Sequence, residues 1–258
     1  MLKPRVIPCL LLRGRGLCKT VKFSDPKYVG DPVNAVKIFN EKEVDELLLL
    51  DITATLEKRE PNYELIGDVA GECFMPLAYG GGVASVDHIR KLHRVGVEKV
   101  SLNSAAFHNR RLVEESCAIF GSSSIVAAID VKKTLFGKYE VWINAGRTNT
   151  KEEPARYAEQ LAGLGVGEIL VNSIDRDGIM GGFDLTLLKS ISSAVDTPVI
   201  ACGGAGTLNH LREAIDKSGV NAVAAGSMFV FHGKHKAVLI NYPTPVELET
   251  LKLVNYPP

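Results

Sequence analysis

The sequence repeats itself at a fixed distance, and this repeat restricts the folds that the chain can adopt. The glycine run that begins at Gly80 follows a short apolar segment, and a similar run begins at Gly203, 123 residues later. Residues 96–104 and 219–227 are also similar, at the same offset. All strand–helix repeats resemble one another to some degree, but two separate matches at one offset indicate two similar halves, about 1–122 and 123–258.

Short apolar runs of the kind found in buried parallel strands alternate with helical patterns along the chain. We expect the strands to start near Val6, Leu47, Leu77, Val100, Val126, Ile169, Val199 and Ala222. This alternation predicts an α/β fold with a parallel sheet, for which an open, doubly wound sheet is one solution. No GxGxxG turn follows the first strand, however, and two similar halves close naturally into a ring. We therefore predict one (βα)8 TIM barrel domain, built from two half-barrels, over residues 1–258.

Two segments interrupt the alternation. Residues 13–30 form a polar, glycine-containing stretch that is long for a connection inside a compact domain, which indicates a loop of the active site. Residues 139–143 alternate between apolar and polar side chains, and a turn signal precedes them. We interpret them as part of a small hairpin after the fifth strand.

The composition excludes several classes of function. Thirty basic residues balance thirty acidic ones without long charge runs, so neither nucleic acid nor a membrane surface is an expected partner. No apolar stretch approaches the ~20 residues of a membrane span, and no signal peptide is apparent, so we expect a cytoplasmic protein. Five cysteines lack CxxC spacing and six histidines lack metal-ligand spacing, so we predict no disulfide framework, metal or cofactor. Cys9 and Cys73 have the apolar neighbours of reduced core cysteines.

Small polar residues and glycines gather where the predicted strands end. The ends of parallel barrel strands meet at one mouth, where active sites form. Glycine with serine or asparagine follows strands three and four, and again strands seven and eight, which predicts one phosphate site in each half. Close packing of helices on strands would also account for single glycines. A ligand with a phosphate at each end would fit two such sites.

Two carboxylates, Asp51 and Asp130, end the strands between those glycine clusters. At the mouth of the barrel, Asp130 is suited to act as a general base or to hold a ligand hydroxyl. A helix N-cap, or a salt bridge with Lys132 or Lys133, is the alternative role for this residue.

Seven segments carry a resemblance to a known family. They are residues 6–10, 50–54, 80–82, 100–106, 128–130, 173–178 and 203–206. Together they resemble HisF, the cyclase subunit of imidazole glycerol phosphate synthase, over nearly the whole chain. The run Ser-Ile-Asp-Arg-Asp-Gly at 173–178 is the most specific. The phosphoribosyl-imidazole isomerase of the same pathway has a similar barrel but resembles the chain less in this run.

The resemblance implies a lyase of the cyclase type within a glutamine amidotransferase complex. A HisH-like glutaminase subunit would dock at the N-terminal face of the barrel, next to Glu98, and ammonia would cross the barrel interior. The resemblance also implies an ammonia gate made of Arg5, Glu46, Lys99 and Glu168, each at the start of a strand. It assigns Asp130 to acid–base catalysis and Lys19 to a loop that folds over the substrate. The phosphate positions that it implies are Gly82, Asn103 and Ser104 in one half, and Asp177, Gly178, Gly203, Gly204, Gly226 and Ser227 in the other.

One departure from the family concerns the chemistry. HisF uses two aspartates for acid–base work, and the first of them falls at Leu11, which cannot transfer a proton. Asn172 and Cys202 also replace hydroxyl residues of the family. The chain is more similar to a variant group of HisF-like proteins that accompany a glutaminase and a separate amidotransferase in the biosynthesis of surface polysaccharides, such as lipopolysaccharide.

Three hypotheses about function follow. The chain delivers ammonia for the amidation of a sugar acetamido group; or it is an authentic cyclase of histidine biosynthesis; or it is a non-catalytic scaffold that binds a phosphorylated small molecule and activates its glutaminase.

Overall fold

Eight parallel strands form a closed ring in the computed structural model, which describes residues 4–233 and 235–252. The ring strands are β1 (Arg5–Arg13), β4 (Leu47–Asp51), β5 (Leu77–Gly80), β6 (Lys99–Leu102), β7 (Ile125–Lys133), β10 (Glu168–Ser173), β11 (Val199–Cys202) and β12 (Ala222–Ala225). The ring closes because β1 pairs in parallel with β4 on one side and with β12 on the other. The predicted (βα)8 barrel is thus confirmed, and each strand starts within one residue of the expected position.

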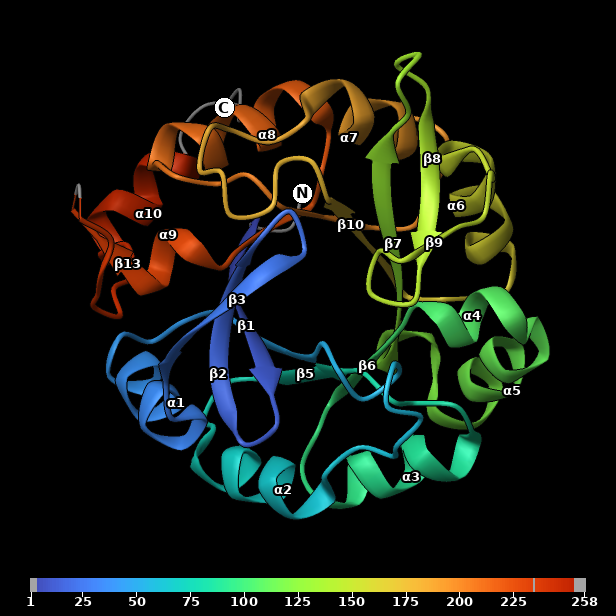
Figure 1. The fold of residues 1–258 in the computed structure, drawn as a ribbon, viewed down its shortest axis with the longest axis horizontal. Helices are drawn as coiled ribbons and strands as arrows, with labels where there is room; N and C mark the ends of the chain where they lie inside the picture. The colour runs from blue at the N-terminus through green and yellow to red at the C-terminus, as the bar shows by residue number, and fades with distance from the viewer. Residues whose placement is uncertain (1–3, 234, 253–258) are drawn as a thin grey trace.

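Helices surround the ring of strands (Figure 1). They are α1 (Pro32–Glu41), α2 (Tyr63–Glu72), α3 (Val86–Arg94), α4 (Ser104–His108), α5 (Arg110–Phe120), the 3₁₀ turn η1 (Ser122–Ser124), α6 (Pro154–Gly163), α7 (Leu185–Ser192), α8 (Leu208–Ser218), α9 (Ser227–Val230) and α10 (Pro245–Lys252). The main apolar core lies between the strands and this outer layer. The sequence explains how α1 begins, because the carboxylate of Asp31 accepts from the backbone N–H of Asn34 and proline occupies the first turn.

The two halves of the barrel use the same helix caps. In α3 the Ser85 hydroxyl accepts from the N–H of His88, and in α8 Thr207 caps His210 in the same way. The Nδ1 atom of each histidine also accepts a backbone N–H just before its helix. These caps are 122 residues apart, and in this part of the barrel Gly81 is therefore the structural equivalent of Gly203. The sequence alignment that paired Gly80 with Gly203 was one residue out, whereas β6 and β12 do keep the offset of 123. The repeated caps support the interpretation of two half-barrels.

Two antiparallel hairpins extend the mouth side of the ring. Strands β2 (Gly16–Val21) and β3 (Ser24–Gly30) pair with each other, and β2 also pairs with the end of β1. Figure 1 shows this hairpin across the middle of the ring. The expectation of a loop over residues 13–30 was therefore wrong in form, because the segment is regular structure.

The second hairpin is the one that the sequence predicted. Strand β8 (Tyr139–Ile143) pairs with the extended end of β7, and the short β9 (Thr148–Asn149) pairs with β8. A further pair of short strands, β13 (Phe231–His232) and β14 (Ala237–Val238), lies near the C-terminal end of the described chain.

The interior of the barrel holds a separate apolar cluster. Its buried members are Ile7, Cys9, Leu48, Ala78, Val126, Leu170, Ile200, Cys202, Ala222 and Ala224. They alternate along each strand with residues that face the helices, as a closed parallel barrel requires. Several of these interior side chains are small. Those nearest the carboxyl ends of the strands border the polar mouth of the barrel.

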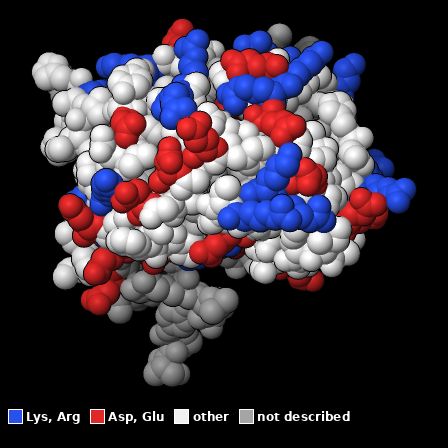
Figure 2. Space-filling model, turned by 90° about the horizontal axis from the view of Figure 1, so that it is seen from below, with Lys and Arg blue, Asp and Glu red and all other residues white. Residues whose placement is uncertain are grey.

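The structure also locates the surface charges and the cysteines. Figure 2 shows acidic and basic side chains interspersed on one side of the molecule, without a large patch of one sign. All five cysteines are free thiols; Cys9 is buried as expected, whereas Cys73 is only partly buried. In the part of the chain that the structure describes, no helix is long and apolar enough to cross a membrane.

Candidate functional site

A cavity of about 650 Å³ lies at the carboxyl ends of the barrel strands. It brings together all twelve residues that the sequence assigned to catalysis or to substrate and phosphate binding at the mouth. These are Lys19, Asp51, Gly82, Asn103, Ser104, Asp130, Asp177, Gly178, Gly203, Gly204, Gly226 and Ser227. The cavity size is typical of small-molecule sites.

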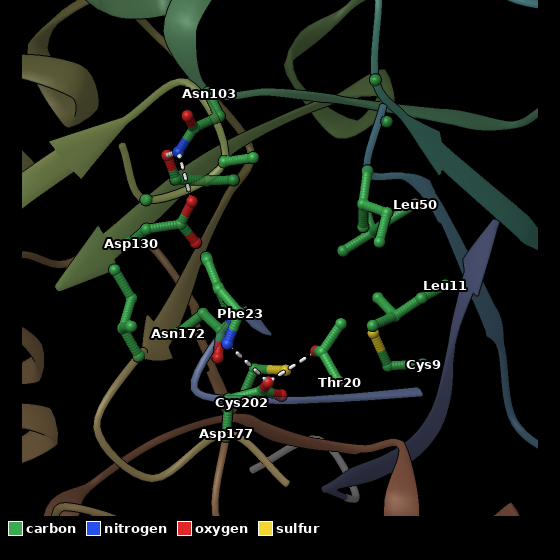
Figure 3. Close-up of a pocket in the computed structure, with 18 of the residues that line it drawn as sticks. Cys9, Leu11, Thr20, Phe23, Leu50, Asn103, Asp130, Asn172, Asp177 and Cys202 are labelled. Carbon is green, nitrogen blue, oxygen red and sulfur yellow. Dashed lines mark hydrogen bonds between the residues drawn. The ribbon is translucent and has the colours of Figure 1, made fainter. Parts of the chain in front are cut away.

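Asp130 lies on β7 and points into the cavity (Figure 3). The side-chain amide of Asn103 donates to its carboxylate at 3.3 Å and to the carbonyl of Ala128 at 3.0 Å. Loss of hydration raises the pKa of Asp130 to about 7, and the nearby charge of Asp177 adds to the effect. A carboxyl group that titrates near neutral pH can accept or donate a proton during a reaction.

Asp51 organises its own loop. Its carboxylate accepts from the N–H groups of Thr53 and Ala54, at 3.0 Å each, and forms a 2.7 Å salt bridge with Arg59. The carboxylate is fully buried by these contacts. A Cβ atom added to Gly81 would lie 2.3 Å from the carbonyl oxygen of Asp51, so glycine permits the close approach of the two loops. Asp51 therefore shapes this side of the cavity, and a direct contact with a ligand stays a prediction.

Lys19 lies inside the mouth rather than on the surface. It belongs to β2, is buried, and donates from Nζ to the backbone carbonyl of Cys9. The ammonium group also lies against Gly226, because a Cβ atom there would clash with it. The lysine thus places a positive charge beside the glycine cluster of the second half.

Asp177 fastens the β2–β3 hairpin over the cavity. It accepts from the hydroxyl of Thr20 at 2.7 Å and from the N–H of Phe23 at 3.3 Å, as Figure 3 shows. Burial raises the pKa of Asp177, although these two hydrogen bonds oppose the rise. A Cβ atom on Gly178 would lie 2.2 Å from the carbonyl of Thr20, so the hairpin packs directly on this glycine. Hairpin contacts therefore occupy the Oδ2 atom of Asp177, one of the expected phosphate positions.

The opposite rim carries a second loop that sequence reasoning missed. The hydroxyl of Ser104 accepts from the N–H of Asn144 at 2.9 Å. Asn144, Ala145 and Gly146 all have positive φ, and Phe23 of the hairpin packs against Gly146. Asn144 and Gly146 in this run are both residue types that favour such a turn. The residues that hold the hairpin, Thr20 and Phe23, gave no local signal because their partners are more than 100 residues away.

The wall of the cavity across from Asp130 is apolar. Figure 3 shows Leu11 and Leu50 together on this wall, next to Cys9. The two leucines are neighbours on the paired strands β1 and β4. Leu11 lines the cavity, so the position at which the resemblance implies a catalytic aspartate lies within the site itself.

Asn172 and Cys202 occupy the floor of the cavity on adjacent strands. Asn172 is nine-tenths buried, and its Oδ1 atom has no hydrogen-bond partner among the described residues. The thiol of Cys202 interacts with that of Cys9, and this interaction lowers the pKa of Cys9 despite its burial. The sequence marked Asn172 and Cys202 only as replacements of hydroxyl residues.

A ring of four charged side chains lies at the start of the barrel strands, the end away from the cavity. Lys99 donates from Nζ to Glu46 at 2.9 Å and to Glu168 at 3.0 Å, and Arg5 pairs with both of these glutamates. Burial lowers the pKa of Arg5, but the two carboxylates outweigh this and raise it. The four charges alternate in sign and cancel. Glu98 is exposed at the strand start next to Lys99.

Residues 4–233 and 235–252 contain no evident metal-binding site. No group of three or more His, Cys, Asp and Glu side chains in this part of the chain is placed to hold a metal ion.

The fold and the two ends of the barrel define a class of protein. It is a (βα)8 barrel with a small-molecule cavity at the mouth, one near-neutral carboxyl group in that cavity, and a salt-bridged ring across the opposite opening. Comparison with known proteins narrows the class.

Residues 5–236 match the family described as "Histidine biosynthesis protein". A protein of Pseudomonas aeruginosa, provisionally named imidazole glycerol phosphate synthase subunit hisF2, is 55% identical over 249 residues, which cover 96% of this chain and 99% of the relative. A similarly named HisF subunit of Leptospira borgpetersenii is 47% identical, over 97% of this chain and 99% of the relative. A hisF3 subunit of Vibrio vulnificus is 48% identical, over 96% and 95%. The chain therefore belongs to the histidine biosynthesis protein family, among its HisF-like members.

Proposed function

We propose that this HisF-like chain receives ammonia from a HisH-like glutaminase through the barrel and supports the amidation of a sugar acetamido group in surface-polysaccharide biosynthesis. One observation carries the proposal. The chain keeps the complete charged ring at the entrance of the barrel, but the cavity has Leu11 where a cyclase of this family has its first catalytic aspartate. This combination fits a protein that conducts ammonia and no longer cyclises.

The interior of the barrel supports conduction of the neutral molecule. Between the ring and the cavity the strands present an apolar cluster in which Ala78, Ala222 and Ala224 are small. An apolar interior strongly disfavours the ammonium ion and accepts uncharged ammonia at lower cost. In the proposal, the ring separates this interior from the glutaminase, which docks at the exposed Glu98 and its surroundings.

The cavity supports the loss of cyclase chemistry. General acid–base catalysis typically contributes 10²–10⁴-fold, and the cyclase reaction divides this work between two aspartates. Here Asp130 is available, but Leu11 and Leu50 form the wall where the second group would stand. The glycine clusters that line the cavity suit a phosphorylated ligand, with Gly203, Gly204 and Gly226 near the ammonium group of Lys19.

The test compares one reaction, cyclisation, between the chain in complex with its glutaminase and an authentic HisF–HisH pair. Purified complex is supplied with glutamine and with the cyclase substrate of histidine biosynthesis, and an authentic HisF–HisH pair serves as the positive control. We expect glutaminase-dependent cyclisation at least about 100-fold below the control, from the lower bound on acid–base catalysis. A rate within a few-fold of the control would contradict the proposal.

An authentic cyclase is the second candidate, and the names of the relatives favour it. In this case Asp130, whose pKa is raised to about 7, serves as both base and acid. Complementation decides the matter, because an authentic cyclase restores growth of a histidine auxotroph that lacks HisF. The Leu11→Asp variant controls for expression and assembly, since it reinstates the family residue.

A third candidate is a non-catalytic scaffold that activates the glutaminase when a phosphorylated ligand binds. The carboxylate of Asp51 is engaged by hydrogen bonds and a salt bridge within its own loop, and these contacts favour a structural role for this residue. Normal amidation by a chain that carries both Asp130→Asn and Asp51→Asn would support the scaffold.

A further inference from the structure

The hairpin of β7 and β8 ends in two exposed apolar side chains. Leu135 and Phe136, which we call the apolar tip, are 102% and 94% exposed and are the most exposed large apolar side chains among the described residues. Figure 1 shows the end of this hairpin outside the layer of helices. Single apolar side chains are ordinary on a protein surface, but two adjacent and almost fully exposed ones on a projecting hairpin indicate a binding surface.

The turn that presents the apolar tip is held by its own hydrogen bonds. The N–H of Thr134 donates to the carbonyl of Lys138 at 2.7 Å, and the N–H of Gly137 donates to the carbonyl of Thr134 at 2.9 Å. The hydroxyl of Thr134 accepts from the N–H of Lys138 at 3.2 Å. Asparagine, aspartate, glycine and serine satisfy such a turn, so the fold does not need leucine and phenylalanine at its centre. The two apolar side chains are therefore left for contact with another molecule.

The hairpin fixes the position of the apolar tip relative to the cavity. Strand β7 continues from the barrel to Lys133, and Asp130 and Val131 on it pair with β8. The N–H of Lys133 donates to the carboxylate of Asp175 at 2.8 Å, which ties the hairpin to the segment after β10. The five residues from Asp130 to the apolar tip span about 17 Å of strand. One small protein domain, about 30 Å across, can thus bind the tip and cover the mouth together.

Conduction of ammonia, as proposed above, requires a consumer at the mouth. In neutral water ammonia is mostly protonated, and the ammonium ion has no lone pair with which to attack a carbonyl carbon. A barrel that released ammonia to solvent would therefore lose the benefit of conducting it. The enzyme that consumes the ammonia has to lie against the mouth. The apolar tip is on this side of the molecule, because β7 runs toward the mouth and the tip lies beyond its end.

The charges beside the apolar tip suit a protein better than a lipid surface. The ammonium group of Lys133 lies 3.8 Å from the carboxylate of Asp184, so its charge is partly offset within this chain. Membrane-surface anchors instead combine apolar side chains with an excess of basic residues that face anionic lipids. A second copy of this chain is also a poor fit, since contact between two tips buries far less than the roughly 800 Å² per partner of a specific interface.

We propose that the apolar tip is the docking anchor for the enzyme that consumes the ammonia and holds the acceptor sugar. Leu135 and Phe136 insert into an apolar pocket of that enzyme, and the pocket rim carries an acidic residue opposite the exposed Lys138. The inference rests on the proposed function and deepens it, because it names the partner at the mouth and the part of this chain that the partner binds. The glutaminase and this enzyme then occupy opposite ends of the barrel at the same time.

Photo-crosslinking in cells of the source organism identifies what covers the apolar tip. The photoreactive residue p-benzoylphenylalanine is placed at Phe136 in one variant and at Phe74 in another, since Phe74 is 87% exposed but precedes β5, at the opposite end of the barrel. Position 136 is expected to give a light-dependent adduct with an enzyme that aminates its acceptor, identified by mass spectrometry and assayed after purification with ammonium chloride.

Several outcomes of the crosslinking would overturn the inference. They are the absence of an adduct at position 136, an adduct there with lipid, with a second copy of the chain, with the glutaminase or with a protein that does not use ammonia, and the same adduct from position 74.

Removal of the apolar tip measures its contribution to docking. The double variant Leu135→Ser/Phe136→Ser is compared with the control Phe74→Ser, and circular dichroism checks that both are folded. Biolayer interferometry with the purified enzyme is expected to show at least about 30-fold weaker binding of the double variant, the effect of losing a binding hot spot, and unchanged binding of the control. Amidation with glutamine should fall in the double variant, whereas amidation with ammonium chloride should not. Binding of the double variant within about threefold of the unsubstituted chain would refute the docking role.

The two proposals can fail independently. An adduct from position 136 with an enzyme that uses ammonium chloride, but takes no nitrogen from glutamine, would keep the docking anchor and reject the proposed function. Glutamine-dependent amidation at the same rate with and without the apolar tip would reject the docking anchor alone.

Discussion

Removing Lys99 from the charged ring tests whether the ring is a cooperative structural unit. In the Lys99→Met variant, Glu46 and Glu168 lose ion pairs of 2.9 and 3.0 Å. Their side chains are only 4% and 12% exposed, so the charges cannot recover full hydration. Breaking a buried pair typically costs 3–5 kcal/mol, but Arg5 still pairs with both glutamates and retains about half of the compensation. We therefore expect the free energy of unfolding to fall by about 2 kcal/mol.

Urea denaturation at neutral pH measures this loss, and the fluorescence of Trp142 together with circular dichroism follows the transition. Lys37→Met is the matched control, since Lys37 forms a 3.5 Å pair with Glu72 in which both side chains are about half exposed. Such a surface pair contributes about 0–1 kcal/mol. A double-mutant cycle with Glu168→Gln should give a coupling energy of about 1 kcal/mol or more. If Lys99→Met costs no more than Lys37→Met, or if the cycle is additive, the ring is not a unit and the reasoning is refuted.

Three further predictions concern the mouth and the outer layer. Because the pKa of Asp130 rises from 3.8 to about 7 on folding, the folded state binds an extra proton between these values, and the contribution of Asp130 to stability falls as pH rises from about 4 to 7. Asp130→Asn should remove this contribution, with a gain in the free energy of unfolding of about 4 kcal/mol at pH 8 in denaturation experiments. Gly178→Ala should loosen the β2–β3 hairpin and speed its cleavage by trypsin several-fold, because the new Cβ meets the backbone of β2. Gly14→Ala is the control and should not have this effect, since Gly14 has a similar positive φ but open space around it. Tyr242→Phe should lower the free energy of unfolding by about 1–2 kcal/mol, since the buried hydroxyl of Tyr242 donates to the backbone of β1 at 2.8 Å. Tyr28→Phe on the exposed hairpin is the control and should change the free energy of unfolding by no more than about 0.5 kcal/mol.

The sequence predicted the barrel because its strands are apolar runs, which can be recognised from the local sequence alone. The C-terminal strand ends then had to meet at one mouth, and this topological rule alone assembled residues as far apart as Lys19 and Ser227. The same rule placed Arg5 and Glu168 at the opposite end, although their direct pairing came only from the structure.

Predictions from the local sequence failed where long-range contacts decide the conformation. Residues 13–30 are polar and were expected to form a loop, but the end of β1 provides an edge on which β2 can pair. The contact of Thr20 with Asp177 spans 157 residues and has no local signature. Asp51 ended a strand as predicted, but Arg59 and its own loop determine how the carboxylate is used. The shift between Gly80 and Gly81 in the internal repeat became visible only through the helix caps.

The hairpin over the mouth has a consequence for turnover. The hairpin residues from Lys19 to Pro26 line part of the mouth, so we expect a ligand seated beneath them to leave when the hairpin lifts. Lifting must break three hydrogen bonds to Asp177, from the Thr20 hydroxyl and from the N–H groups of Lys22 and Phe23, and must separate Phe23 from Gly146. Since Asp177 lies on the segment that follows β10, the clasp joins the first strand–helix unit to the sixth. We therefore expect a contact that bridges the two halves of the barrel to influence the rate of ligand release.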